Sequence, residues 1–178
     1  MLKVRGGKYL HRILKEPPSE ITRPTKDMVK EGMFNSLGNI YGESFLDLFG
    51  GSGAIGIEAY SRGAQDVTIN DSNKEALKVI KSNLETLQIK DINVTSLDYV
   101  DAIKKYSSLG LNFDNIFLDP PYKLVVDLEF IKTIVDAGIL APNGVIIIET
   151  DYDLDERLFE LYKIRLLKYG RSRIYILR

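Results

Sequence analysis

From residue 44 to residue 149 the sequence alternates short apolar runs, rich in β-branched and aromatic residues, with longer segments of helical periodicity. Strands are expected at residues 44–49, 66–70, 92–96, 113–118 and 145–149, and helices at about 54–62, 76–87 and 128–137. A further helix is expected between Thr25 and Gly38, with an apolar stripe formed by Met28, Val29, Met33, Phe34 and Leu37. Because each helix returns the chain to the same edge of the sheet, the alternation predicts a parallel sheet.

The last part of the chain breaks this rhythm. Two strand-like runs, 162–168 and 173–177, are separated by a gap too short for a crossover helix, which predicts an antiparallel hairpin. The aliphatic run 145–149 is typical of a central strand covered on both faces. We therefore expect an α/β fold with a mostly parallel seven-stranded sheet that ends in an antiparallel hairpin and carries helices on both faces. The start, up to Pro17-Pro18, is expected to be irregular.

Length and composition restrict the possible chemistry. A chain of 178 residues fits one globular domain, and the absence of cysteine excludes disulfides, thiolate metal sites and a cysteine nucleophile. The apolar runs are too short to span a bilayer, and the opening segment lacks the apolar stretch of a signal peptide. We therefore expect a cytoplasmic protein without a membrane partner.

The net charge of −1 hides an uneven distribution. Residues 1–30 carry eight cations and three acids, and residues 163–178 carry six cations and no acid. Such segregation favours a basic surface that meets a polyanion, although solvated charges at two chain ends are the simpler alternative.

A glycine-rich turn follows the expected strand 44–49. Gly51, Gly53 and Gly56 spell a GxGxxG pattern, which by itself fits a dinucleotide site as well as a simple turn. Asp47 lies just before these glycines, and its carboxylate would repel a pyrophosphate but favour an ammonium or a hydroxyl group. S-adenosylmethionine carries an ammonium and no phosphate, so the pattern favours that cofactor.

Two further acids follow the next two expected strands. Asp71 is placed to reach the ribose hydroxyls of a nucleoside, although it is also placed to cap a helix before Asn73. Asp98 is placed to accept a hydrogen bond from an adenine amino group, and it is equally placed to cap the segment 99–106. Both residues therefore support a nucleoside cofactor without proving one.

The tetrapeptide Asp119-Pro120-Pro121-Tyr122 ends the expected strand 113–118, where open α/β sheets place their ligands. Two prolines supply no backbone donors, so the Asp119 carboxylate and the Pro120 carbonyl form an edge made only of acceptors. Such an edge matches an NH₂ group, and the ring of Tyr122 offers a face on which a base can stack. The pattern predicts methylation at a base nitrogen.

Together these motifs resemble the RsmD-like group of ribosomal-RNA guanine-N2 methyltransferases, which are Rossmann-fold S-adenosylmethionine-dependent enzymes. The resemblance spans the chain and rests on Arg5-Gly6-Gly7 with Arg12, on Arg23-Pro24-Thr25, on the turn 47–53, on Asp119 to Tyr122, and on Glu149-Thr150. One departure is His11, where the pattern has a glycine.

The resemblance implies three groups of site residues. Asp47, Gly51 and Gly53 would hold the methionine part of the cofactor, Asp71 the ribose and Asp98 the adenine. The full expected cofactor site is Asp47, Phe49, Gly51, Ser52, Gly53, Asp71, Ser72, Asp98 and Tyr99. The expected catalytic residues are Asp119, Pro120 and Tyr122, and the expected RNA-binding residues are Arg5, Lys8, Arg12, Arg23 and Thr25. Arg23 could serve an RNA phosphate, the cofactor carboxylate or the packing of the first helix.

The resulting hypothesis divides the chain into a basic extension for RNA contact, residues 1–20, and a methyltransferase domain, residues 21–178. The expected reaction is methyl transfer to the N2 amine of a guanine in small-subunit (16S) ribosomal RNA. The expected partner is ribosomal RNA within a partly or fully assembled subunit, met by a monomer without a metal. Alternatives are an adenine-N6 methyltransferase on DNA or RNA, a non-catalytic nucleic-acid-binding module with a relic cofactor pocket and, last, a nicotinamide oxidoreductase.

Overall fold

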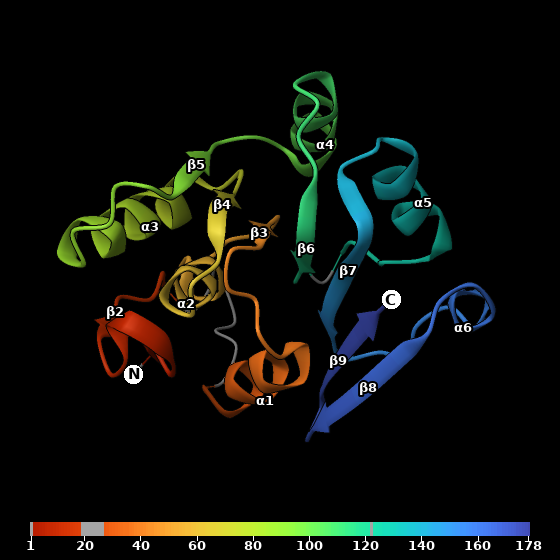
Figure 1. Cartoon of the computed structure of the whole chain (residues 1–178), viewed down its shortest axis with the longest axis horizontal. Helices are drawn as coiled ribbons and strands as arrows, with labels where there is room; N and C mark the ends of the chain where they lie inside the picture. Colours follow the sequence, from red (N-terminus) through yellow and green to blue (C-terminus); the bar gives the residue numbers. More distant parts are fainter. Residues whose placement is uncertain (1, 19–26, 122) are drawn as a thin grey trace.

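The computed structural model describes residues 2–18, 27–121 and 123–178 (Figure 1). Its main sheet has seven strands in the order β5-β4-β3-β6-β7-β9-β8. The strands are β3 (Ser44–Asp47), β4 (Gln65–Asn70), β5 (Asn93–Thr95), β6 (Phe113–Leu118), β7 (Leu140–Thr150), β8 (Ile164–Tyr169) and β9 (Ser172–Leu177). The first five strands in this order are parallel, and β9 runs antiparallel to both of its neighbours. The predicted α/β fold with its terminal hairpin is confirmed.

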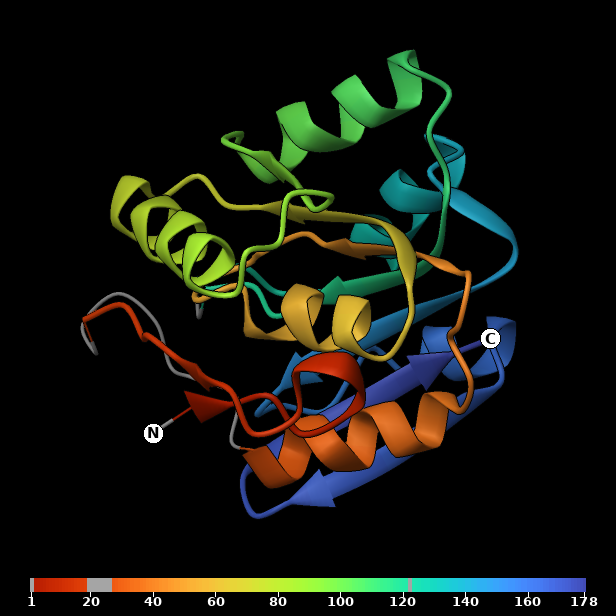
Figure 2. The ribbon, with the colours of Figure 1, turned by 60° about the vertical axis from the view of Figure 1, so that its left-hand side comes forward.

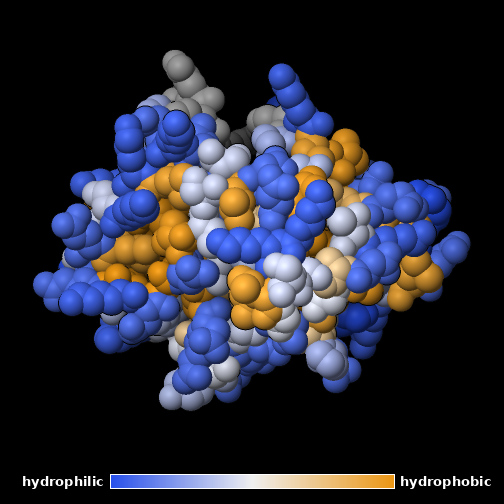
Figure 3. All heavy atoms as spheres, turned by 90° about the horizontal axis from the view of Figure 1, so that it is seen from above, coloured by the Kyte–Doolittle hydropathy of each residue, from blue (hydrophilic) through white to orange (hydrophobic). Residues whose placement is uncertain are grey.

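Helices cover both faces of the sheet. Helices α1 (Asp27–Leu37), α2 (Ala54–Ser61) and α3 (Lys74–Thr86) pack on one face, and α4 (Tyr99–Ser108), α5 (Leu128–Asp136) and α6 (Arg157–Leu161) on the other. The alternation of side chains along each strand creates these two layers, because Phe45 faces the first set of helices and Leu46 the second. Figure 2 shows α2 and α4 on opposite sides of the sheet. The end of the molecule seen from above in Figure 1 is mostly hydrophilic, with hydrophobic patches between the polar residues (Figure 3).

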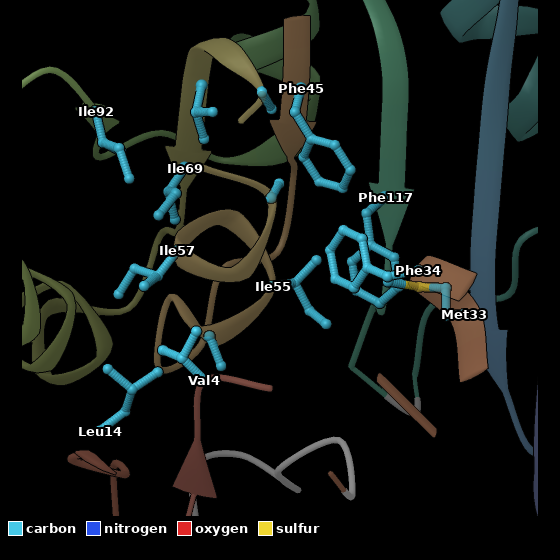
Figure 4. Close-up of a cluster of buried hydrophobic side chains, with 14 of the residues drawn as sticks. Val4, Leu14, Met33, Phe34, Phe45, Ile55, Ile57, Ile69, Ile92 and Phe117 are labelled. Atoms are coloured by element: carbon cyan, nitrogen blue, oxygen red, sulfur yellow. The ribbon is translucent and has the colours of Figure 1, made fainter. Parts of the chain in front are cut away.

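The N-terminal segment is more ordered than the sequence indicated. Strand β1 (Leu2–Lys3) pairs antiparallel with β2 (Ile13–Leu14), and the short 3-10 helix η1 (Gly7–Tyr9) lies between them. Val4 and Leu14 are buried against α2, as the close-up of this cluster shows (Figure 4). The expectation of an irregular start is therefore wrong for this part, because its few apolar side chains complete the core.

His11 occupies the position at which the pattern of the resembled family has a glycine. Its φ is 68°, in the left-handed region that glycine adopts most easily. The turn between β1 and β2 is closed by a hydrogen bond from the His11 N–H to the carbonyl of Val4, at 2.9 Å. The local conformation that a glycine would favour is thus kept, at some cost in backbone strain.

Two other expectations need correction. Met28, placed on the apolar stripe of α1, is 70% exposed, whereas Lys30 of the same helix is fully buried. Strand β7 begins at Leu140 and not at Val145 as expected. Both residues pair with β6, and a bulge lies between the two pairings. The bulge contains Pro142-Asn143-Gly144, which reads as a turn in the sequence. Helix α6 was not predicted.

The order of the strands creates a switch point beside β3. The chain moves outward from β3 to β4 and β5, and then returns to β6 on the other side of β3. Open α/β sheets bind ligands at such a point, in the crevice outside the carboxyl ends of the strands. The residues that follow β3, β4, β5 and β6 therefore lie where a fold of this kind binds its ligand.

A buried ion pair joins the N-terminal segment to two helices. The Nζ of Lys30 lies 3.2 Å from Oε2 of Glu58 on α2, and both side chains are fully buried. Lys30 also donates to the carbonyl of Lys3, and Glu58 accepts the Arg5 N–H at 2.8 Å and the Nε of Arg62 at 2.9 Å. Burial lowers the pKa of Lys30, and the neighbouring Glu58 opposes that shift. Each charged group in this cluster has an oppositely charged partner, which is the condition for keeping it buried.

Replacing Lys30 should expose the cost of this arrangement. Lys30→Met leaves the buried Glu58 with one cation fewer, and we expect the free energy of unfolding to fall by about 3 kcal/mol. Lys78→Met is the matched control, because Lys78 pairs with Glu75 at 2.7 Å on the exposed face of α3, where such a pair contributes about 0.5 kcal/mol or less. Urea unfolding of the two variants measures both values, and equal losses would contradict the role given to the buried pair.

Candidate cofactor and substrate site

Four aspartates lie at the carboxyl ends of neighbouring strands. Asp47 is the last residue of β3, while Asp71 follows β4 directly and Asp119 follows β6. In the register of the sheet Asp47 lies beside Ile69 of β4 and beside Phe117 of β6. Asp98 lies between β5 and α4. The structure therefore brings the four predicted acids to one edge of the sheet, at the switch point.

The turn after β3 packs tightly onto β4. Gly51 and Gly53 have φ values of 55° and 78°, which glycine tolerates without strain. A Cβ on Gly50 would lie 2.4 Å from a methyl carbon of Ile69, so the close approach requires glycine there as well. The Gly50 N–H donates to the carbonyl of Asn70 at 2.7 Å. The turn is thus fixed against the end of β4 by backbone contacts.

Asp47 occupies the space at the start of α2. Its side chain is 1% exposed, and its Oδ2 accepts the Gly56 N–H in the first turn of that helix at 3.2 Å. Among the described residues its Oδ1 has no hydrogen-bond partner. A pyrophosphate would need the positive end of this helix, which a carboxylate now holds. An ammonium group suits the open Oδ1, so the residues present fit S-adenosylmethionine better than a dinucleotide.

Burial, helped by the nearby charge of Asp71, raises the pKa of Asp47 to about 7, although the N–H groups of Gly56 and Phe49 oppose the shift. A carboxyl group that pays for burial in this way gains from any cation placed beside it. The site therefore favours a positively charged ligand next to Asp47.

Asp71 ties the glycine-rich turn to β4. Its Oδ2 accepts the Gly51 N–H at 2.8 Å, and its Oδ1 accepts the Asn73 N–H at 2.7 Å. The alternative that Asp71 caps α3 is wrong, because Asn73 is the N-cap and accepts the N–H groups of Glu75 and Ala76. Each carboxylate oxygen keeps a second lone pair for a hydroxyl group of a ligand.

Asp98 caps α4, which is one of the two roles expected from the sequence. Its exposed side chain accepts the Val100 N–H at 2.9 Å. Its contact with adenine remains a prediction, as does that of Ser72, which is exposed next to Asp71.

Phe49 and Tyr99 lie side by side at the same edge. Their ring centroids are 5.8 Å apart, and the ring of Tyr99 stacks on Phe130 of α5 at 5.3 Å. Phe49 and Tyr99 are both half-buried. The three rings form an apolar row between the glycine-rich turn and α5.

Two buried asparagines that the sequence reading missed hold this region together. The Nδ2 of Asn70 donates to the carbonyls of Leu48 and Leu97 at 3.1 and 3.0 Å, which joins the ends of β3, β4 and β5. The Nδ2 of Asn83 on α3 donates to the carbonyls of Ser52 and Lys15, both at 3.0 Å. In the sequence, each of these residues is a polar side chain within an apolar pattern, which could have indicated its role. Asn70 ends a strand, and Asn83 interrupts the apolar face of α3.

The segment after β6 is fixed at two points. The Leu124 N–H donates to the carbonyl of Pro121 at 2.8 Å, and the Val126 N–H donates to Oη of Tyr152 at 2.8 Å. Asp119 and Pro120 are half-buried at the start of this segment. Tyr122 lies outside the described residues, so its stacking role remains a prediction.

The predicted RNA-binding residues have different surroundings. Lys8 and Arg12 are exposed, and the Nζ of Lys8 lies 5.3 Å from the centroid of the Tyr9 ring. Arg5 is half-buried, and its Nε lies 3.3 Å from Oδ2 of Asp27. Arg23 and Thr25 lie outside the described residues. The side chain of Arg5 is thus engaged within the protein, which the sequence did not indicate.

Within the described ranges no group of three or more histidine, aspartate and glutamate side chains is arranged to hold a metal ion. None of the helices in those ranges is both long and apolar enough to span a membrane.

Three features of this structure define a Rossmann-fold S-adenosylmethionine-dependent methyltransferase. They are the seven-stranded sheet with this strand order, the buried acid before the glycine-rich turn, and the Asp-Pro-Pro segment after β6. The family described as conserved hypothetical protein 95 matches residues 2–178. The chain belongs to this family, the RsmD family that its motifs resemble.

Relatives with known names agree with this assignment. The putative rRNA methyltransferase YlbH of Bacillus subtilis is 37% identical over 98% of this chain and 97% of its own length. Ribosomal RNA small subunit methyltransferase D of Haemophilus influenzae is 37% identical over 85% of this chain and 80% of its own. Among solved structures, the putative methyltransferase YhhF of Escherichia coli superposes with a TM-score of 0.81 at 26% identity, covering 99% of this chain and 96% of its own.

The raised pKa of Asp47 predicts a pH-dependent stability. The folded, ligand-free protein holds a proton on Asp47 up to about pH 7, whereas in the unfolded chain the group loses it near its ordinary value of 3.8. The contribution of Asp47 to stability is therefore complete at low pH and is lost as the pH rises through about 7.

Asp47→Asn should remove this effect. We expect its free energy of unfolding to exceed that of the unchanged protein by on the order of 4 kcal/mol at pH 8 and by less than half as much at pH 5. The same variant should bind S-adenosylmethionine roughly tenfold or more weakly, because an amide cannot pair with an ammonium. Urea unfolding and calorimetric titration measure the two effects. An unchanged affinity would show that Asp47 does not face the cofactor.

Proposed function

We propose that this protein transfers the methyl group of S-adenosylmethionine to the exocyclic N2 amine of a guanine in small-subunit (16S) ribosomal RNA. The observation that carries the proposal is the pairing of two features at one switch point. The turn after Asp47 fits the cofactor, and the acceptor edge of Asp119 and Pro120 follows the neighbouring strand. The names of the relatives support ribosomal RNA as the substrate class, and the resemblance to the guanine-N2 group supports the position on the base.

The proposed cofactor site follows the edge of the sheet from β3 to β5. Asp47 pairs with the ammonium of the methionine part, beside the backbone of Gly51, Ser52 and Gly53. Asp71 accepts the ribose hydroxyls, with Ser72 next to it. Asp98 accepts the adenine amino group, and Phe49 and Tyr99 supply an apolar surface for the ring. When bound, S-adenosylmethionine supplies an activated methyl group on a sulfonium.

Asp119 and Pro120 solve the orientation problem of the reaction. The lone pair of a guanine amine is delocalised into the ring, so the nitrogen attacks only if it is held in line with the sulfur–methyl bond. Acceptors on both N–H bonds favour a more tetrahedral nitrogen and stabilise the positive charge that grows on it. The proton becomes acidic as the new bond forms and passes to Asp119 or to water. Tyr122 would stack on the base.

RNA contact is proposed for the basic N-terminal extension, residues 1–20. Lys8 and Arg12 are exposed and available to phosphates. Arg5 would have to leave its pair with Asp27 to reach a phosphate, and Arg23 and Thr25 are proposed as further RNA contacts. The base must leave its stack to reach Asp119, which costs least in a loop or bulge of a folded RNA. We propose a cytoplasmic monomer that acts on the RNA of a partly or fully assembled small subunit.

Asp119→Ala should abolish methyl transfer and change the affinity for S-adenosylmethionine by no more than a few-fold, because the side chain serves the base and not the cofactor. Asp136→Ala, an exposed acid at the end of α5, is the matched control and should keep full activity. The measurement supplies tritiated S-adenosylmethionine with small subunits from a bacterium that lacks its own methyltransferase D, and maps the labelled nucleotide.

Each outcome of this experiment decides between functions. Label on a guanine amine supports the proposal, and label on adenine would replace it by adenine-N6 methylation. No transfer together with tight RNA binding would indicate a binding module that retains a cofactor pocket. A large loss of cofactor binding in Asp119→Ala would mean that its assigned role is wrong.

A further inference from the structure

The hairpin tip, defined here as residues 168–172 between β8 and β9, lies at the same edge of the sheet as the proposed methyl-transfer site. Leu118 of β6 is in register with Ile148 of β7, and Thr150, two residues further toward the carboxyl end, is in register with Arg173 of β9. Arg173 in turn pairs with Lys168 of β8. The arrowheads of β6, β7 and β8 accordingly point the same way (Figure 1). The tip thus faces the side on which a substrate would approach Asp119.

The tip carries two exposed cations that are free of ion pairs among the described residues. Lys168 and Arg171 are both exposed, and neither lies within 4.0 Å of a carboxylate in the part of the chain that the structure describes. Arg173 differs, because its Nε lies 3.1 Å from Oδ1 of Asp153 and its Nη1 donates to the carbonyl of Asp151 at 2.7 Å. The protein therefore neutralises the cation at the base of the hairpin tip and leaves two at its end.

Packing holds the tip in one position. Tyr169 lies so close to α1 that a Cβ on Gly32 would be 1.7 Å from its Oη. On the other side, Oγ of Ser172 donates to Oε1 of Glu149 on β7 at 2.9 Å. A tip fixed against both α1 and β7 presents its cations without a large loss of backbone entropy on binding.

The distance from the site suits a polyanion that already occupies it. Three strand spacings separate β6 from β8, which amounts to about 14 Å. A nucleotide bound at Asp119 would bring phosphates a few positions away along the RNA to this distance. The N-terminal extension reaches the same edge from the other side, because the Lys15 N–H and carbonyl bond to Asn83, which also holds Ser52 of the glycine-rich turn.

We propose that the hairpin tip is a second RNA contact, in which Lys168 and Arg171 bind phosphates that flank the target base. This inference rests on the proposed function. Charges on the edge strand also protect a sheet from pairing with another chain, which is a simpler explanation for cations on β8. That explanation applies equally to Lys163 and Arg165, which are exposed near the opposite end of the same strand. The two pairs of cations therefore separate the two explanations.

The test compares Lys168→Gln/Arg171→Gln with Lys163→Gln/Arg165→Gln, which remove the same charge from opposite ends of one strand. The measured quantities are the affinity for unmodified 16S ribosomal RNA and its dependence on salt concentration. Loss of two phosphate contacts should weaken binding about tenfold and reduce the slope of log affinity against log salt by roughly 1.5. The opposite pair should bind as the unchanged protein does. Urea unfolding of the two double variants, and of the single variant Arg171→Gln in the turn itself, checks that the fold is intact.

Equal effects of the two double variants, or no effect of either, would overturn the inference. Its failure is distinguishable from failure of the proposed function. An unchanged protein that labels no guanine in small subunits contradicts the function, whatever the tip does. A protein that labels the guanine and binds RNA equally well without the tip cations contradicts only the second contact.

Discussion

The structure of the site depends on one carboxylate that is buried at the start of a helix. The Asp47 carboxylate is buried at the end of β3, where its Oδ2 accepts the Gly56 N–H, while Oδ1 has no hydrogen-bond partner among the described residues. The loss of solvation disfavours the ionised carboxylate at this position, which raises the pKa of Asp47 to about 7. A proton on the carboxyl group relieves this cost up to about pH 7, and a cation beside Oδ1 would relieve it for the ionised group. An apolar residue at this position would avoid the cost of burial, and in the proposed complex the ammonium of the cofactor would recover that cost as binding energy.

Everything around Asp47 keeps it in that position. Asn70 joins the ends of three strands, Asp71 fixes the glycine-rich turn through the Gly51 N–H, and close packing on Ile69 leaves no room for a side chain at Gly50. Asn83 extends this framework to the N-terminal segment, and the pair of Lys30 and Glu58 anchors the first residues of that segment. The N-terminal segment is thus connected to the glycine-rich turn by polar contacts, so that the proposed RNA contact and the proposed cofactor contact would share one support.

The sequence predicted the parallel sheet, its hairpin and the acids at its edge because these depend on local patterns. Hydrophobic periodicity, glycines and prolines act over a few residues. The sequence did not predict that Lys30 is buried while Met28 of the same helix is exposed. Helical periodicity does not reveal that Glu58, on a helix packed nearby, pairs with Lys30. The sequence also missed the start of β7, since Pro142-Asn143-Gly144 forms a bulge in a strand where the letters read as a turn. The stacking role of Tyr122 remains a prediction.

By itself the sequence determined the fold class, the glycine-rich turn and the position of Asp119 at the end of a strand, because side-chain chemistry and backbone preference are properties of short segments. Only the tertiary structure decided which of these groups meet. It placed β6 next to β3 and so brought Asp119 to the same edge of the sheet as Asp47, it engaged Arg5 with Asp27, and it turned the hairpin tip toward that edge. Such placements depend on strand order and on buried pairs between distant residues, which no local pattern records.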